Sequence, residues 1–161
     1  MTAESDRQRI IDVELVERNE VHRRPEVEHE RAVAIFDLIE DNQFMPCEHP
    51  DAGPFALRLR IEDNRLIFDV RTAEGEPLTE IAVSLLSFRA IVRDYFLVCD
   101  SYYQAIRKAT PSQIEAIDMG RRGLHNEGSE LLRERLADKV TMDLKTARRL
   151  FTLICVLHIR G

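Results

Sequence analysis

The stretch FALRLRIEDNRLIFDVRT, residues 55–72, decides the fold of this chain. Apolar residues alternate with charged residues on both sides of Asp63-Asn64, which is the period-two pattern of strands with one buried face. A short Asp-Asn connection between two such runs indicates a tight turn, so the stretch predicts a β-hairpin. A third alternating run follows the turn at residues 74–77 and passes through Ile81, Val83 and Leu85. These three runs predict an antiparallel sheet.

Upstream of the hairpin, residues 11–15 alternate in the same way and predict a further strand. Pro25 suits the first turn of a helix, and the glutamates that follow it would lie at the positive end of the helix dipole. The apolar spacing predicts that the buried face of this helix consists of Ala32, Ile35, Phe36 and Ile39. Residues 42–54 contain three prolines and a glycine and are predicted to form a loop.

From Ser87 onward the apolar residues recur at helical spacing. The segment Thr110-Pro111-Ser112-Gln113 combines a capping threonine, proline at the first helical position and glutamine three residues after the cap, and it predicts the start of a long helix. Asp143 is predicted to cap a last helix over residues 144–159. That helix is apolar almost all round from Leu150, so we expect it in the core or in a subunit interface.

These elements predict an α+β fold, with a small antiparallel sheet of three to four strands, one helix after the first strand and a C-terminal set of three helices. Residues 1–161 are expected to form a single domain, which is large enough for a core without metal or disulfide support. Residues 1–9 are expected to be a mobile N-terminal tail.

Composition limits the classes of function. The net charge of -6 argues against a general nucleic-acid binder, because such proteins carry basic surfaces. No run of eighteen apolar residues and no apolar leader segment is present, so neither a membrane partner nor secretion is expected. The three cysteines, an odd number without CxxC spacing, favour a reduced, cytoplasmic protein.

The segment from Met119 to Gly128 interleaves two arginines, a histidine, an asparagine and a glutamate with three glycines. Each glycine costs roughly 1 kcal/mol relative to alanine inside a helix, so three of them indicate a close approach of another group or a bend. A continuous helix over residues 111–136 is the favoured interpretation. A break near Gly120–Gly123 is the alternative, in which the glycines beside the arginines would suit a backbone anion nest.

On a continuous helix, one flank carries Asp118, Arg122, His125 and Ser129, while Arg121 lies on the neighbouring apolar stripe. The functional hypothesis is an anion site, in which Arg121 and Arg122 bind phosphate or carboxylate and His125 donates a hydrogen bond or moves a proton. The structural alternative is that Arg121 pairs with Asp118 or with a carbonyl at a helix C-terminus, that Arg122 pairs with Asp118, and that His125 caps a neighbouring element.

A second basic pair, Arg148-Arg149, lies near the start of the last helix, where the helix dipole disfavours a positive charge. It is expected to be held by an acidic partner, either Asp143 or a residue of another helix. A solvated basic patch is the alternative.

The segment TPSQIEAIDMGRRGLHNEGSELLRE, residues 110–134, resembles an uncharacterised bacterial protein family, number 0262 of the UPF series. The stretches VEHERAVAIFD (27–37), DYF (94–96) with SYY (101–103), and ARRLFTLICVLH (147–158) share this resemblance. It implies a bacterial cytoplasmic protein and brings no catalytic residues with it.

Two other clusters of reactive side chains are interpreted as parts of the structure and not as functional sites. The cluster Cys47, Glu48, His49 and Asp51 matches no zinc spacing and is read as a solvated loop, so no metal is expected. Cys155 and His158 share a helix face whose apolar surroundings favour burial over nucleophilic catalysis.

The absence of a nucleophile–base pair or a cofactor motif argues against an enzyme and predicts no cofactor. The leading hypothesis is a non-catalytic cytoplasmic binding or regulatory module that acts through protein–protein contacts, as a possible homodimer. The alternative is a protein, or a small enzyme, that binds an anionic phosphate- or carboxylate-bearing small molecule through Arg121, Arg122 and His125. RNA binding is disfavoured by the acidic balance.

Overall fold

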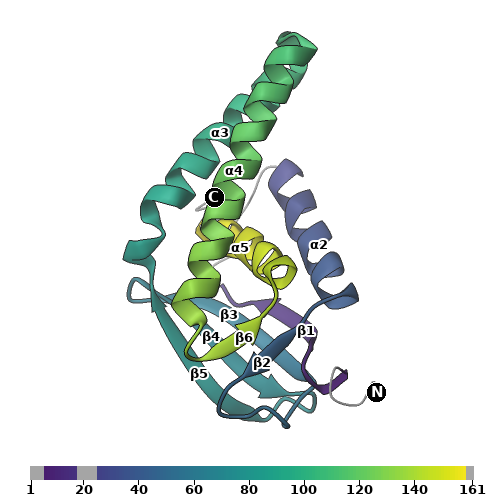
Figure 1. The fold of residues 1–161 in the computed structure, drawn as a ribbon, viewed down its shortest axis with the longest axis vertical. Helices are drawn as coiled ribbons and strands as arrows, with labels where there is room; N and C mark the ends of the chain where they lie inside the picture. Colours follow the sequence, from purple (N-terminus) through teal and green to yellow (C-terminus); the bar gives the residue numbers. More distant parts are fainter. Residues whose placement is uncertain (1–5, 18–24, 159–161) are drawn as a thin grey trace.

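A computed structural model describes residues 6–17 and 25–158 of this protein (Figure 1). The strands are β1 (Ile10–Leu15), β2 (Phe44–Pro46), β3 (Phe55–Glu62), β4 (Arg65–Thr72), β5 (Pro77–Ser84) and β6 (Val140–Met142). The helices are α2 (Pro25–Glu40), α3 (Arg89–Lys108), α4 (Pro111–Leu136) and α5 (Leu144–His158), with a short 3-10 turn at Leu85–Ser87 before α3. The fold is α+β with a four-stranded main sheet, one helix after the first strand and three C-terminal helices, which confirms the predicted fold class.

The predicted hairpin forms the centre of the main sheet. Strands β3 and β4 pair antiparallel around a two-residue turn in which Asp63 and Asn64 have φ angles of 53° and 60°, as in a type I′ turn. The apolar residues Phe55, Leu57 and Leu59 of β3 are buried, whereas Arg58 between them is exposed. The alternating pattern therefore identified both the strand and its buried face.

The main sheet has the order β1-β3-β4-β5, and it is mixed where the sequence predicted an antiparallel sheet. Strand β1 pairs with β3 in parallel, with Val13 opposite Leu57. The prediction was wrong for this pair because α2 lies between the two strands in the chain. A helical crossover brings the chain back to the same end of the sheet, which is the connection that parallel pairing requires.

A second small sheet corrects the loop predicted for residues 42–54. Phe44–Pro46 forms β2 and pairs antiparallel with β6, where Phe44 lies opposite Met142. Both of these residues are buried. The partner strand comes from the opposite end of the chain, so no local pattern around the prolines could have indicated it.

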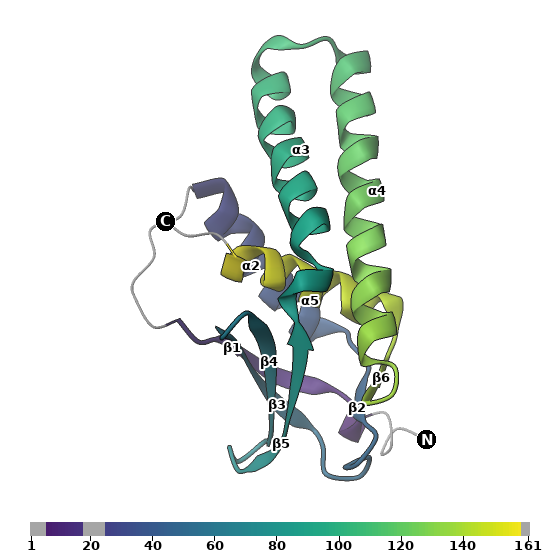
Figure 2. The same ribbon diagram turned by 90° about the vertical axis from the view of Figure 1, so that its left-hand side faces the viewer.

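Helices α3 and α4 form a long antiparallel hairpin that projects beyond the sheet, and α5 lies across the base of this hairpin, between it and α2 (Figures 1 and 2). Both predicted helix starts are confirmed. The Thr110 hydroxyl accepts from the Gln113 amide at 3.3 Å in a capping box, and the Asp143 carboxylate accepts from the Thr146 amide at 2.9 Å. Eight residues of α5 are buried within this chain, which places the helix in the core.

The buried face of helix α2 agrees only in part with the one predicted. Ile35 and Ile39 pack against the core, but the buried residues are Val27, Ala34 and Leu38, whereas Phe36 is 67% exposed. Apolar residues surround much of this helix, so spacing alone permits more than one buried stripe. Packing against β1 and α5 selects the one observed.

Part of the predicted N-terminal tail is held against the body. The carbonyl of Gln8 accepts from the Phe44 amide and that of Arg9 from the Phe55 amide, both at 2.9 Å. The predicted tail therefore does not extend to these two residues, and residues 1–5 lie outside the described part of the chain.

Helix α4 is continuous through Gly120–Gly128, so the alternative of a break is wrong. The three glycines have different environments. A Cβ atom on Gly128 would lie 2.2 Å from the ring of Phe151, whereas Cβ atoms on Gly120 and Gly123 would meet nothing within 4 Å. Only Gly128 is explained by a close approach, because it lets α5 lie directly on the backbone of α4.

This difference gives a testable contrast. Gly128→Ala is expected to lower the free energy of unfolding by about 1–3 kcal/mol, because the added methyl group must displace the Phe151 ring. Gly123→Ala is the matched control and is expected to raise it by about 0.5–1 kcal/mol, since alanine restricts the unfolded chain and meets open space. Urea denaturation of the two variants measures both changes, and equal stabilisation by both would contradict the packing argument.

Candidate functional site

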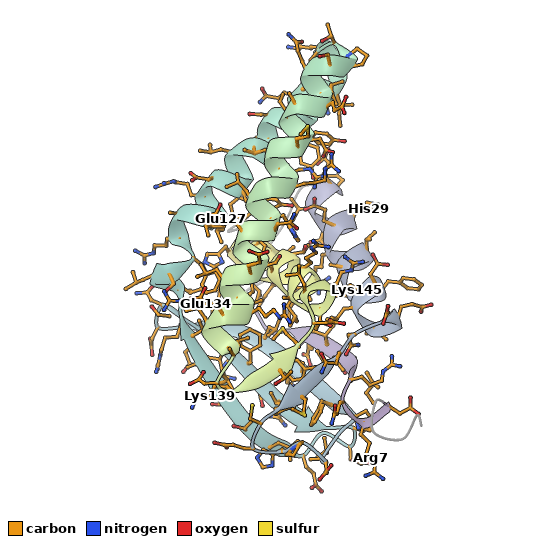
Figure 3. The ribbon with its side chains drawn as sticks, viewed as in Figure 1. Arg7, His29, Glu127, Glu134, Lys139 and Lys145 are labelled. Atoms are coloured by element: carbon orange, nitrogen blue, oxygen red, sulfur yellow. The ribbon has the colours of Figure 1, made fainter. Side chains whose placement is uncertain are left out.

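Four helices line a cavity of about 550 Å³ that is open to solvent. Figure 3 shows the side chains of this region, with His29 of α2 labelled. Helix α2 forms one wall, α4 and α5 form the others, and α3 contributes Tyr95. The lining residues are His29, Glu30, Val33, Ala34, Asp37, Tyr95, Arg121, Arg122, His125, Asn126, Arg148, Arg149 and Thr152. Most of them are polar or charged, and they come from segments far apart in the sequence.

On α4, Asp118 positions two of the lining arginines. Arg121 donates from Nε and Nη2 to one carboxylate oxygen of Asp118, at 3.0 and 2.6 Å, and Arg122 Nε lies 3.2 Å from the other oxygen. The Arg121 guanidinium also lies over the ring of Tyr102, 5.2 Å from its centroid. One carboxylate thus orients two guanidinium groups at the cavity and neutralises only one of their charges.

On α5, two more arginines reach the cavity. Arg149 Nε lies 3.7 Å from the carboxylate of Asp37 on α2, so the acidic partner expected for this pair comes from another helix. Arg148 donates from Nε to the side-chain oxygen of Asn126 on α4 at 3.0 Å. Within the described residues, Arg148 has no ion pair with a carboxylate. Its positive charge is therefore oriented by a neutral group and left uncompensated.

The charges around the cavity do not balance. Four guanidinium groups line it, and the carboxylates beside them are those of Glu30, Asp37 and Asp118, which leaves an excess of one positive charge. Burial raises the pKa of Glu30 above its ordinary value, although Arg121 and a hydrogen bond from the Tyr103 hydroxyl, at 3.4 Å, oppose that rise. Protonation of this carboxyl would increase the positive excess.

His125 lies between two aromatic rings at the base of the cavity. Its ring centroid is 5.5 Å from that of Tyr95 and 5.3 Å from that of Phe151. Burial, reinforced by the positive charges of Arg121, Arg148 and Arg149, lowers the pKa of His125 to about 4. The imidazole is therefore neutral at physiological pH.

The Thr152 hydroxyl contacts His125. Its oxygen lies 2.7 Å from His125 Nε2 and 3.2 Å from the Arg148 carbonyl, and its single proton can be donated to either. The neutral imidazole therefore carries one proton, on Nε2 or on Nδ1, and accepts a hydrogen bond at the other nitrogen.

The structure brings three of the five predicted site residues, Arg121, Arg122 and His125, to one cavity. Asp118 lies behind the two arginines and orients them. Ser129 is fully buried and donates to the carbonyl of His125 at 2.7 Å, so it belongs to the core of the helix interface. The Asp118 pairs proposed as the structural alternative for Arg121 and Arg122 also exist, and they hold these side chains at the cavity wall. His125 does not cap a neighbouring element, because it contacts Thr152 in the interior of α5.

Sequence reasoning did not assign Glu30, Asp37 or Asn126 to the site. A signal for the α2 residues was present, because Glu30, Ala34 and Asp37 recur four and three residues apart and share a helix face. Arg148-Arg149 lies near the start of its helix, where the helix dipole disfavours positive charge. That position indicated that the pair has a partner, and other helices supply it. What the sequence lacked was any indication that α2 and α5 pack together.

Other candidate sites have structural explanations. Cys155 is buried, and burial raises the pKa of its thiol, so it is not available as a nucleophile. Cys47 is an exposed free cysteine, and in residues 6–17 and 25–158 no three His, Cys, Asp or Glu side chains gather as metal ligands would. None of the described helices is both long enough and apolar enough to span a bilayer.

Comparison with known proteins places the chain in a family. Residues 7–160 match the model of the uncharacterised protein family UPF0262. The chain belongs to this family. It is 62% identical to a UPF0262 protein of Paramagnetospirillum magneticum over 155 residues, which cover 96% of this chain and 98% of that protein.

Two further relatives also match over nearly their whole length. A UPF0262 protein of Rhodospirillum rubrum is 62% identical over 156 residues, covering 97% of this chain and 96% of the relative. One of Brucella canis is 56% identical over 161 residues and covers both chains completely. These matches confirm the resemblance inferred from the sequence and identify an uncharacterised bacterial family. No solved structure matches this chain.

The neutral imidazole predicts how stability depends on pH. Because the pKa of His125 is about 4 in the folded protein and near 6.5 in the unfolded chain, the unfolded chain binds more protons at this residue between these values. The free energy of unfolding is therefore expected to fall as the pH decreases from 6.5 to 4. Urea denaturation over this range should show a smaller fall for His125→Gln, while the opposite contribution of Glu30 is common to both proteins. Identical pH profiles would contradict the assignment, and so would an NMR titration of His125 near pH 6.5.

Proposed function

We propose that this protein binds a small molecule bearing phosphate or carboxylate in the cavity between α2, α3, α4 and α5, and that it acts as a non-catalytic, ligand-responsive module. The observation that carries the proposal is the arginine-rich wall, in which Arg148 is held by Asn126 and lacks a carboxylate partner among the described residues. An oriented guanidinium with spare donors suits the bidentate recognition of an anion.

Preorganisation supports this proposal. Asp118 fixes the directions of Arg121 and Arg122 before any ligand arrives, and Asp37 and Asn126 do the same for the arginines of α5. Side chains that are already ordered lose less conformational entropy when they bind. The cavity volume of about 550 Å³ lies within the range of about 300–1,000 Å³ that small-molecule sites occupy.

The absence of catalysis is part of the proposal. The pKa of about 4 makes His125 a poor general base at neutral pH, and its Nε2 atom is engaged by the Thr152 hydroxyl. We also propose a cytoplasmic location, which the free thiols of Cys47, Cys99 and Cys155 support.

Removal of the uncompensated charge tests the site. Arg148→Gln is expected to weaken the binding of phosphorylated compounds about tenfold or more, because a charge-assisted hydrogen bond contributes about 1.5–3 kcal/mol. Arg93→Gln is the matched control, since it removes the same charge from the outside of α3, where the side chain is 70% exposed. Isothermal titration calorimetry with a panel of phosphorylated and carboxylated metabolites measures the affinities. The site is refuted if both variants lose affinity equally, or if none of the compounds binds the wild-type protein at millimolar concentration.

A second candidate function is contact with another protein, including a second copy of this chain. Its specific support is on α2, where Val33 and Phe36 lie one turn apart on the helix and are 42% and 67% exposed. Val33 also lines the cavity, so a partner at this face would lie next to a bound ligand. The predicted homodimer is proposed to use this face, since α5 is buried within the chain.

Light scattering tests the dimer. Phe36→Ser is expected to shift the protein towards the monomer without lowering its thermal stability, because the Phe36 ring contributes little to the core. Leu97→Ser is the control, since Leu97 is 61% exposed on α3. A wild-type protein that is monomeric at the highest concentration measured would remove this proposal.

A further inference from the structure

The cavity has two chemically different ends. At one end, Arg148, Arg149 and Asn126 lie beside Asp37 of α2. At the other end, the carboxyl of Glu30 lies near Arg121 and accepts from Tyr103. Glu30 and Asp37 are seven residues apart on the same helix, which is a rise of about 10 Å. A ligand that fills this space therefore meets guanidinium donors at one end and a carboxyl acceptor at the other.

The hydrogen-bond acceptors at the Glu30 end of the cavity have fewer donors than they can accommodate. In the described part of the chain, the one hydrogen bond to Glu30 is that from Tyr103, although a carboxyl group accommodates several donors. His125 adds a second polar group, because of its ring nitrogens only Nε2 is hydrogen-bonded among the described residues, to Thr152, and Nδ1 accepts or donates according to the tautomer. A fully ionised anionic group does not satisfy the Glu30 carboxylate, since it has no proton to donate. The ligand must carry hydrogen-bond donors in addition to its charge.

The neighbouring charges favour neutral donors. Arg121 acts electrostatically on both Glu30 and His125, so its charge offsets the attraction that the Glu30 carboxylate would exert on a ligand ammonium group. Hydroxyl groups donate to a carboxylate, and they donate to or accept from an imidazole nitrogen, without repulsion from Arg121. They also suit a site that contains both donors and acceptors, since each hydroxyl can act in either role.

Space for the hydroxyl-bearing part extends beyond Glu30. A second cavity of about 270 Å³ adjoins the first, and the two share His29, Glu30 and Arg121 as lining residues. Its other walls are Glu26, Tyr102 and Tyr103. Glu30 and Arg121 thus lie at the junction between the cavities, where they can contact the middle of an extended ligand.

We infer that the ligand is a phosphate monoester of a polyhydroxylated, sugar-like molecule, with its phosphate on Arg122, Arg148 and Arg149 and its hydroxyls on Glu30 and His125. This inference rests on the proposed function and specifies its ligand. A phosphate monoester is favoured over a carboxylate because three acceptor oxygens and a charge near two match several converging guanidinium groups better than one carboxylate does.

The test compares ribose 5-phosphate with n-pentyl phosphate, which carries the same phosphate and number of carbons but no hydroxyl groups. Calorimetry on the wild-type protein is expected to show at least about tenfold tighter binding of ribose 5-phosphate. Glu30→Gln should reduce this ratio several-fold, whereas Glu28→Gln, which changes a residue outside both cavities, should leave it unchanged. A merely structural role of Glu30 would weaken both ligands alike and preserve the ratio.

The outcomes separate the inference from the proposed function. Equal affinity for the two monoesters, tighter binding of pentyl phosphate, or an unchanged ratio in Glu30→Gln would overturn the inference while leaving an anion site in place. If neither monoester nor inorganic phosphate binds the wild-type protein at millimolar concentration, the proposed function fails as well. Thermal unfolding of each variant verifies that it is folded.

Discussion

The ring of Phe151 lies against the backbone of Gly128, and the arrangement of the C-terminal helices depends on this contact. A side chain at Gly128 would have to displace the Phe151 ring from this position. One turn earlier on α4, His125 packs on the same ring and reaches Thr152 of α5. This contact fixes the distance between the arginines of α4 and those of α5. The arrangement of charges in the cavity therefore depends on how Phe151 packs against α4.

The same packing decides the electrostatics. The arginines of α4 share one carboxylate, Asp118, whereas the arginines of α5 rely on Asp37 and on the neutral side chain of Asn126. Four guanidinium groups in one cavity repel one another, and this repulsion opposes folding. Incompletely neutralised charges that lower stability in this way are typical of functional sites. An anionic ligand would relieve the repulsion, so binding and stability are expected to be coupled in this protein.

His125 shows how burial selects among the roles of a residue. In water an imidazole titrates near neutral pH and can donate, accept or transfer a proton. Here burial and the positive charges of three arginines keep the imidazole neutral, and it packs against two aromatic rings and contacts the Thr152 hydroxyl. The histidine therefore belongs to the helix interface as well as to the cavity wall. Its low pKa is one reason why we propose a binding role and not acid–base catalysis.

The sequence alone determined the local structure and the position of the candidate site. Alternation across residues 55–72, the capping box at Thr110 and the Asp143 cap act over a few residues, and each formed as predicted. The segment of residues 119–128 contains Arg121, Arg122 and His125, which line the cavity, although of its three glycines only Gly128 is explained by packing. The tertiary structure decided the parallel pairing of β1, the pairing of β2 with β6 and the buried face of α2. It also assembled the cavity from Glu30, Asp37, Asn126 and the α5 arginines. Local periodicity does not specify which distant segments meet, since that choice depends on the packing of the whole chain.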